Sequence, residues 1–289
     1  MIPPIEYQIP ETLSGACRIL GEWGWRSKVI AGGTDLVISL RRGEPKPQVL
    51  IDITRIPELR QIEETGGKIR IGAAVTHGEI ASSKLIQRHG KVLSEAASWV
   101  GSPQVRNLGT IGGNIINASP AADTLPPLMV LEATGKVLSP GGSKEVPLAD
   151  LFLGPYQSSL NPDELLVQVS FPKLASDFRT GFIRLARRAA MAISRMSVAV
   201  VLRMARGEDR IEEVRISAGA VTPTPRRMWE AESLLKDKTP DEGTMKKAAR
   251  CLSDTMVRRS GVRPSTAYKA PVVEALFLRC MRQALENSP

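Results

Sequence analysis

Two short segments that each carry adjacent glycines constrain the fold of this chain more than any other feature. The first, Ala31-Gly32-Gly33-Thr34-Asp35, follows a short apolar stretch and precedes the helical pattern LVISLRRG. The second is Thr110-Ile111-Gly112-Gly113-Asn114. Glycine lets backbone approach a ligand closely, and a following helix N-terminus offers free N–H groups and partial positive charge. Each segment therefore predicts a glycine loop that cradles an anion, with its backbone N–H groups as donors.

The alternative interpretation of the first segment is a tight strand-to-helix turn. The segment fits neither G-x-G-x-x-G nor G-x-x-x-x-G-K-[ST], so a Rossmann or P-loop site is not supported. Around the second segment, Thr110, Asn114 and Ser119 can hydrogen-bond a phosphate or a ribose. Two such loops, 80 residues apart from Gly32 to Gly112, predict one long diphosphate ligand held between two lobes.

Asp123 needs a different role, because a carboxylate beside a pyrophosphate would be repelled. We expect it to accept hydrogen bonds from neutral hydroxyls, such as those of a ribityl or ribose chain. The alternative is a helix-start residue, since Pro120 and two alanines precede it.

Composition excludes several classes of protein. The three cysteines and two histidines are too few and too dispersed for a zinc site, an iron–sulfur cluster or a disulfide framework. A reducing cytoplasm is therefore expected. The start MIPPIEYQIP is no signal peptide, and no apolar run is long enough to span a membrane. The net charge of +9 permits nucleic-acid binding, but the charges are scattered and only 4% of residues are aromatic. An acidic partner subunit or an anionic cofactor explains that charge equally well.

Periodicity and turn residues predict an α/β unit, then hairpins mixed with helices, then a smaller domain beyond Pro172. Thr76 and Glu79 are spaced as a capping box, and the neighbouring His77 is expected to be structural. The expected helices are 11–23, 76–87, 91–100, a stretch after Ala121, 226–236, 241–253 and 270–286. The expected strands are 28–31, 48–53, 60–64, 68–73, 136–138, 145–147, 165–171, 181–187, 197–204 and 210–218.

These motifs closely resemble the FAD-binding subunit of the molybdenum hydroxylases. The resemblance rests on residues 104–107 (QVRN), Thr110 to Asn114, Ala118-Ser119-Pro120 and Asp123, with Ala31 to Asp35 matching the family's first loop. It covers the whole chain. The family includes the medium subunit of aerobic carbon monoxide dehydrogenase and the flavin domain of xanthine dehydrogenase.

The resemblance implies an α+β fold in two domains. A two-lobed FAD-binding domain of the PCMH or vanillyl-alcohol-oxidase type would occupy residues 1–174, with lobes at about 1–55 and 56–174. A small α/β domain of the carbon monoxide dehydrogenase flavoprotein type, with a three-stranded antiparallel sheet and helices, would occupy residues 177–289.

The resemblance also implies noncovalent FAD, because it places no flavin attachment at His77 or His89. Transferred contacts are Ala31, Gly32, Gly33, Thr34, Asp35, Thr110, Ile111, Gly112, Gly113, Asn114, Ser119 and Asp123. Val100 near the adenine and Leu166 near the flavin ring are weaker transfers. Arg184 stands where the family commonly has a lysine that reaches the flavin. Arginine keeps the charge but not the compact ammonium, and a solvated strand face is the alternative.

The function implied is an oxidoreductase subunit without a catalytic side chain of its own. Electrons would pass from [2Fe–2S] clusters on a small partner subunit to FAD, and from there to an external acceptor. Substrate would be hydroxylated on a large molybdopterin subunit, in a dimer of heterotrimers. Three alternatives remain open: a stand-alone flavoenzyme of the same fold resembling UDP-N-acetylenolpyruvylglucosamine reductase, a docking subunit with an empty flavin site, and a basic nucleic-acid binder.

Overall fold

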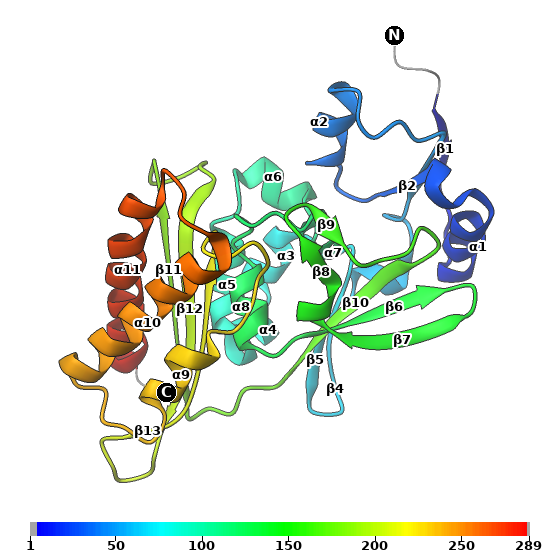
Figure 1. Cartoon of the computed structure of the whole chain (residues 1–289). Helices are drawn as coiled ribbons and strands as arrows, with labels where there is room; N and C mark the ends of the chain where they lie inside the picture. The colour runs from blue at the N-terminus through cyan, green and yellow to red at the C-terminus, as the bar shows by residue number, and fades with distance from the viewer. Residues whose placement is uncertain (1–4, 288–289) are drawn as a thin grey trace.

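The first lobe is a small parallel sheet with two helices. A computed structural model describes residues 5–287, so the first four residues and the last two of the expected domain ranges lie outside it. Strands β1 (Glu6–Gln8), β2 (Ser27–Ile30) and β3 (Val49–Asp52) pair in the order β1-β3-β2, with both pairings parallel. Helices α1 (Leu13–Trp23) and α2 (Leu36–Arg41) connect the strands, as the α/β pattern predicted (Figure 1).

The second lobe is built on a five-stranded antiparallel sheet in the order β4-β5-β10-β6-β7. The expected strand pairs 60–64 with 68–73 and 136–138 with 145–147 do form hairpins. The first turns at Gly66-Gly67, and the second turns at Pro140-Gly141, since Gly142 in β7 already pairs with Ser139. The strands are β4 (Ile62–Thr65), β5 (Lys68–Gly72), β6 (Thr134–Ser139), β7 (Gly142–Pro147) and β10 (Leu165–Pro172). Two short strands, β8 (Phe152–Gly154) and β9 (Gln157–Ser158), form a separate hairpin.

Six helices complete this lobe. They are α3 (His77–Ser82), α4 (Lys84–His89), α5 (Lys91–Ser98), α6 (Pro103–Leu108), α7 (Ile111–Asn117) and α8 (Leu125–Val130). Among them, α4 contacts β4 and β5, and α7 contacts β10. The capping box at Thr76 and Glu79 is confirmed. The single helix expected over 76–87 is wrong, because Ser83 adopts extended backbone, ends α3 and caps α4 with its own hydroxyl. Three short 3-10 helices, Gly24–Arg26, Pro57–Arg60 and Leu148–Leu151, complete the connections of the two lobes.

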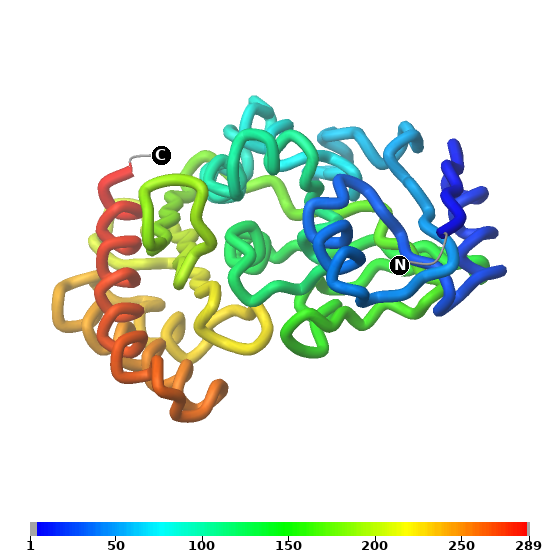
Figure 2. Tube along the Cα trace, turned by 90° about the horizontal axis from the view of Figure 1, so that it is seen from above, coloured from blue at the N-terminus to red at the C-terminus, as the bar shows by residue number. Residues whose placement is uncertain are grey.

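The C-terminal domain is an antiparallel sheet of three strands in the order β11-β12-β13. The strands are β11 (Phe178–Ala186), β12 (Ser194–Met204) and β13 (Ile211–Gly219), and the helices are α9 (Trp229–Leu235), α10 (Glu242–Ser260) and α11 (Thr266–Glu286). Helix α11 packs on β11 and β12, and α8 packs on β12 and β13. Figures 1 and 2 show this sheet between the α10–α11 pair and the helices of the second lobe.

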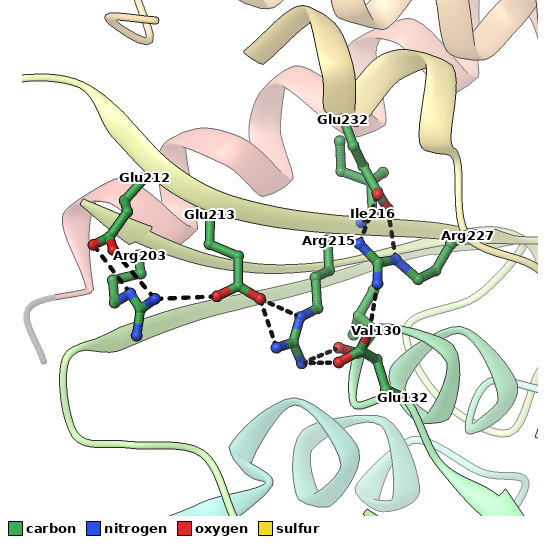
Figure 3. Close-up of polar contacts among 9 residues, drawn as sticks. All are labelled: Val130, Glu132, Arg203, Glu212, Glu213, Arg215, Ile216, Arg227 and Glu232. Atoms are coloured by element: carbon green, nitrogen blue, oxygen red, sulfur yellow. Dashed lines mark hydrogen bonds and ion pairs between the residues drawn. The ribbon is translucent and has the colours of Figure 1, made fainter. Parts of the chain in front are cut away.

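Helix α8 joins the two domains, and all six of its residues are buried. Just beyond the C-terminus of α8, the Glu132 carboxylate forms ion pairs with two arginines of the C-terminal domain. Its Oε2 lies 3.2 Å from Nη1 of Arg215, and its Oε1 lies 2.6 Å from Nη1 of Arg227. Arg227 also forms a bidentate salt bridge with the buried Glu232. Oε1 of Glu232 accepts a further hydrogen bond from the backbone N–H of Ile216 (Figure 3). Apolar packing and this chain of ion pairs therefore hold the domains in one arrangement.

Among residues 5–287, no helix combines the length and the hydropathy needed to cross a membrane.

Candidate functional site

The first glycine segment contacts the second lobe directly. A Cβ placed on Gly32 would lie 1.8 Å from the carbonyl oxygen of Leu108, so only glycine allows this approach. Gly33 has φ +67°, the left-handed region that favours glycine. The two glycines thus have different roles. Gly32 permits close contact between the lobes, and Gly33 permits the turn into α2.

The second glycine segment is helical, which corrects the predicted loop. Thr110 is the N-cap of α7, and its hydroxyl accepts from the N–H of Gly113 at 3.1 Å. The N–H groups of Ile111 and Gly112 donate to Val75 and Ala73 at the end of β5, both at 2.9 Å. The prediction that backbone N–H groups of both segments are free for a diphosphate is therefore wrong for the second one. These tertiary bonds outweigh the poor helix propensity of two glycines.

Gly112 and Gly113 face opposite environments. Gly112 is buried, and a Cβ there would lie 2.6 Å from the Ala73 Cβ. Gly113 is exposed, and a Cβ there would approach only the Thr110 hydroxyl, at 3.0 Å. Gly113 therefore leaves bare backbone open to a ligand, whereas Gly112 allows α7 to pack on the sheet.

The two segments converge at Gly109. A Cβ on Gly109 would lie 3.4 Å from the Thr34 hydroxyl and 3.3 Å from the His77 ring. The backbone N–H of His77 donates to the carbonyl of Gly109 at 3.0 Å. His77 is 1% exposed, and burial lowers its pKa to about 4, so its ring is neutral at pH 7. In the part of the chain that the structure describes, its Nδ1 has no hydrogen-bond partner.

The first segment keeps its donors free. Within residues 5–287, the N–H groups of Gly33 and Thr34 donate to no other residue. Asp35 is exposed and is the N-cap of α2, without a side-chain cap bond. Ala31 is half-buried at the end of β2. These free N–H groups are what the predicted anion-binding role requires, and that role itself stays a prediction.

Asp123 and Arg184 form a buried ion pair between the domains, with Asp123 Oδ2 3.2 Å from Arg184 Nη1 and both side chains 7% exposed. The hydroxyl of Ser194 donates to the same carboxylate oxygen at 2.9 Å. Burial raises the pKa of Asp123, while Ser194 and Arg184 oppose that rise. Two alternatives are thus wrong: Arg184 is not on a solvated strand face, and the N-cap of α8 is Thr124 rather than Asp123.

Arg184 is held from several sides. Its Nη1 donates to the Trp99 and Ala192 carbonyls at 3.1 and 3.2 Å, and its guanidinium lies over the Trp99 ring. Asp123 Oδ1 and Arg184 Nη2 are buried and find no partner among the described residues. The pair therefore presents one free acceptor and one free donor, and leaving either unpaired is costly.

The remaining predicted residues lie around this pair. The Asn114 side-chain oxygen accepts from Thr124 at 2.6 Å, which leaves its amide N–H groups to donate elsewhere. The Ser119 hydroxyl lies 3.5 Å from the Tyr156 hydroxyl. Val100 is half-buried next to Trp99, and its carbonyl accepts from Arg106 at 3.1 Å.

Leu166 is 3% exposed on β10, and a Cβ on Gly135 would lie 3.0 Å from its side chain. The structure thus places Leu166 in the core of the second lobe. Its proposed contact with a flavin ring stays a prediction.

Comparison with known proteins decides the family. Residues 3–174 match the FAD binding domain in molybdopterin dehydrogenase, and residues 182–284 match the CO dehydrogenase flavoprotein C-terminal domain. The chain belongs to the FAD-binding subunits of the molybdenum hydroxylases.

Individual relatives match along almost their full length. The 6-hydroxypseudooxynicotine dehydrogenase complex subunit alpha of Paenarthrobacter nicotinovorans is 31% identical, over 99% of this chain and 96% of its own. The carbon monoxide dehydrogenase medium chain of Hydrogenophaga pseudoflava is 32% identical, over 98% of each. A solved structure of carbon monoxide dehydrogenase from Hydrogenophaga pseudoflava superposes with a TM-score of 0.92 at 31% identity, covering 100% of both chains. This chain is thus an oxidoreductase subunit with an FAD-binding domain.

The residues present fit FAD. The free N–H groups of Gly33 and Thr34 suit a diphosphate, and exposed Gly113 allows close approach. The unpartnered Asp123 Oδ1 suits a hydroxyl donor, and the unpartnered Arg184 Nη2 suits an acceptor.

The sequence did not single out Trp99 or Ser194 for this site. Trp99 meets Arg184 across 85 residues of the chain, and Ser194 meets Asp123 across 71. Ser194 also contacts Arg184, 10 residues away, and that contact depends on the pairing of β11 with β12. The one available signal was Arg184 itself, through the family resemblance.

Proposed function

We propose that this chain is the electron-transfer subunit of a multi-subunit molybdenum hydroxylase. It would take electrons from [2Fe–2S] clusters of a small partner subunit and pass them to an external acceptor. A large partner that carries molybdopterin would hydroxylate the substrate, and two such heterotrimers would pair. The medium-chain and complex-subunit relatives support this proposal, because each belongs to a larger dehydrogenase.

One observation carries the proposal: the two glycine segments meet, with Gly32 packed against the backbone of Leu108. This contact places the free N–H groups of Gly33 and Thr34 beside the N-terminal end of α7. FAD, when bound, supplies redox chemistry that accepts and releases electrons one at a time, which no side chain of this protein provides.

The chain itself binds and orients the cofactor. We assign the diphosphate to the N–H groups of residues 32–34, with Asp35 and Ala31 at the ends of that segment. Thr110, Ile111 and Gly112 position α7, so that Gly113 and the Asn114 amide face the cofactor. Ser119 and Val100 complete the nucleotide side of the site.

Asp123 and Arg184 would act together at the other end of the cofactor, the end to which Leu166 is also assigned. The carboxylate oxygen Oδ1 accepts from a ribityl or ribose hydroxyl, and Nη2 of Arg184 donates to the ring system. The positive charge of Arg184 favours an anionic reduced ring, and its pairing with Asp123 limits that effect.

The test is FAD content and partner association. The purified protein is expected to be yellow, to release FAD on denaturation, and to copurify with an iron–sulfur subunit and a molybdenum subunit when the neighbouring genes are coexpressed. Asp123→Asn should weaken FAD binding at least about tenfold, because the hydrogen bond to the cofactor would no longer be charge-assisted. Asp209→Asn, in the exposed turn between β12 and β13, should leave FAD binding unchanged. A colourless protein, or equal FAD affinity in both variants, would contradict the site.

A further inference from the structure

The excess positive charge of the chain lies entirely in its C-terminal part. Residues 177–289 contain 22 lysines and arginines against 13 aspartates and glutamates, whereas residues 1–176 contain 17 of each kind. Of the residues assigned to FAD, only Arg184 belongs to the charged part. The cofactor therefore accounts for little of this charge, which favours the binding of an acidic surface at the C-terminal domain.

Part of this charge surrounds a groove on helix α10. The groove has a volume of about 470 Å³, and its lining consists of Lys247, Arg250, Cys251, Asp254 and Arg258. The four charged residues are exposed, and Cys251 between them is half-buried. Helix α10 packs on α9 and α11, on the side of the C-terminal domain away from the first lobe (Figure 1). The groove is therefore open to a partner, and none of its residues is assigned to FAD.

The charges of the groove form a stripe along one face of α10. Lys247, Arg250, Asp254 and Arg258 follow one another at intervals of three, four and four residues, which places them on one side of a helix. At about 1.5 Å per residue the stripe is about 16 Å long, or about three helical turns. A partner helix that lies along α10 presents side chains at the same intervals, so the stripe suits a helix as its occupant.

Two of these cations lack a counter-ion. Within residues 5–287, no carboxylate lies within 4.0 Å of Lys247 or Arg250. Nη2 of Arg258 lies 3.6 Å from Oε1 of Glu230. Arg215, by comparison, contacts two carboxylates, and its side chain is 11% exposed. The fold thus neutralises Arg215 but leaves the stripe positively charged.

More positive charge lies beside Glu230. The neighbouring Arg226 and Arg259 have no carboxylate within 4.0 Å among the described residues. Burial and the charge of Arg259 lower the pKa of Arg226, and its buried Nε has no hydrogen-bond partner in the described chain. The cations of this surface therefore outnumber its two carboxylates, Asp254 and Glu230.

We propose that this basic groove docks an acidic helix of a partner subunit. Carboxylates of that helix would lie opposite Lys247, Arg250 and Arg258, and a basic residue would lie opposite Asp254. The inference rests on the proposed function, since the partner is a subunit of the same complex. A protein helix can change the sign of its charge at this spacing, which a uniformly charged polymer cannot.

Other occupants fit this surface less well. A second copy of this chain would bring positive charge against positive charge in a two-fold contact. A nucleic acid offers only phosphates, which Asp254 inside the groove would repel. Helix α9, which packs on α10, exposes Trp229 (61%) and Leu234 (41%). Tryptophan and arginine are enriched at protein interfaces, so the surface favours a protein.

Association of the FAD-loaded protein with the iron–sulfur and molybdenum subunits of the neighbouring genes tests the proposal. Interferometry gives the dissociation constants at low and at high salt. Lys247→Glu/Arg250→Glu turns attraction into repulsion at two positions and should weaken association at least about tenfold at low salt. Arg206→Glu/Lys238→Glu makes the same charge change at exposed positions outside the groove and should alter the affinity little.

Asp254→Lys separates the charge pattern from the net charge. It adds positive charge to the groove, yet it should weaken association several-fold, because the new lysine would face a basic residue. An occupant that is acidic throughout would instead bind this variant more tightly, which would overturn the proposed pattern. The FAD content and the unfolding temperature of each variant report whether the fold is kept.

The outcomes separate this inference from the proposed function. Equal affinities of Lys247→Glu/Arg250→Glu and the parent overturn the inference and leave the proposed function standing. Failure of the parent to bind either subunit overturns both. Titration of the parent with a short DNA duplex tests the other class of occupant: saturable binding that the double reversal abolishes, with subunit association unchanged, would assign the groove to nucleic acid and overturn the inference.

Discussion

Adjacent glycines of α7 should respond in opposite ways to the same substitution. Gly112→Ala would place a Cβ 2.6 Å from the Ala73 Cβ and 2.7 Å from the Ala73 carbonyl oxygen. Neither atom is the end of a flexible side chain, so α7 must shift away from the sheet. Overpacking of this kind costs about 1–3 kcal/mol, and the two simultaneous contacts place this case near about 3 kcal/mol.

Gly113→Ala should leave the fold intact. Its Cβ would approach only the Thr110 hydroxyl, at 3.0 Å, on the exposed side of α7. Alanine gains about 1 kcal/mol of helix propensity over glycine, which offsets the displacement of that hydroxyl. If FAD covers this backbone, the methyl group should weaken FAD binding at least about tenfold, or about 1.4 kcal/mol.

Urea unfolding and FAD titration of the apoprotein separate the two effects. We expect Gly112→Ala to lower the free energy of unfolding and Gly113→Ala to lower FAD affinity with little change in stability. The reasoning fails if Gly113→Ala binds FAD as the parent does, or if Gly112→Ala unfolds at the parent's urea concentration.

Two further substitutions probe buried charges. The unfolded state takes up a proton at His77 between pH 6.5 and about 4 while the folded state does not, so stability should rise with pH across that window. At about 1.4 kcal/mol per pH unit, the free energy of unfolding should rise by about 3 kcal/mol across this window. Thermal unfolding at pH 4.5 and pH 7 measures this pH dependence. The dependence should be smaller in His77→Gln and unchanged in His89→Gln, which retains His77. Glu232→Gln removes the buried one of the two carboxylates that pair with Arg227, while Glu132 remains. This change should cost about 1.5–3 kcal/mol, the range of a hydrogen bond to a charged group. Glu212→Gln, with 48% of its side chain exposed, should cost less than about 1 kcal/mol in the same urea titration, and equal losses would refute the assigned burial effect.

Local patterns predicted most of the secondary structure. The capping box at Thr76 and Glu79 and the hairpin turn at Gly66-Gly67 depend on neighbours within a few residues, and both formed as expected. Helices α6 and α7 were not predicted. Helix α6 does carry a local start signal, with Ser102 as N-cap and Pro103 in the first turn, whereas the local signal of α7 is weak. Helix α7 has two glycines in its first turn. It is stabilised by hydrogen bonds from Ile111 to Val75 and from Gly112 to Ala73, 36 and 39 residues earlier in the chain.

Part of the proposed site was readable from residue types along the chain, namely glycines where backbone stays bare and an aspartate that suits hydroxyl partners, whereas Arg184 was indicated by the family resemblance alone. The assembly of these residues was not readable from the sequence. Gly32 meets Leu108 across two lobes, and Asp123 meets Arg184 across two domains, 61 residues apart. Such contacts depend on how whole sheets and helices pack, and a pattern of near neighbours does not contain that information. The same packing assigns Gly112 to the core and Gly113 to the surface, a distinction that two identical letters cannot express.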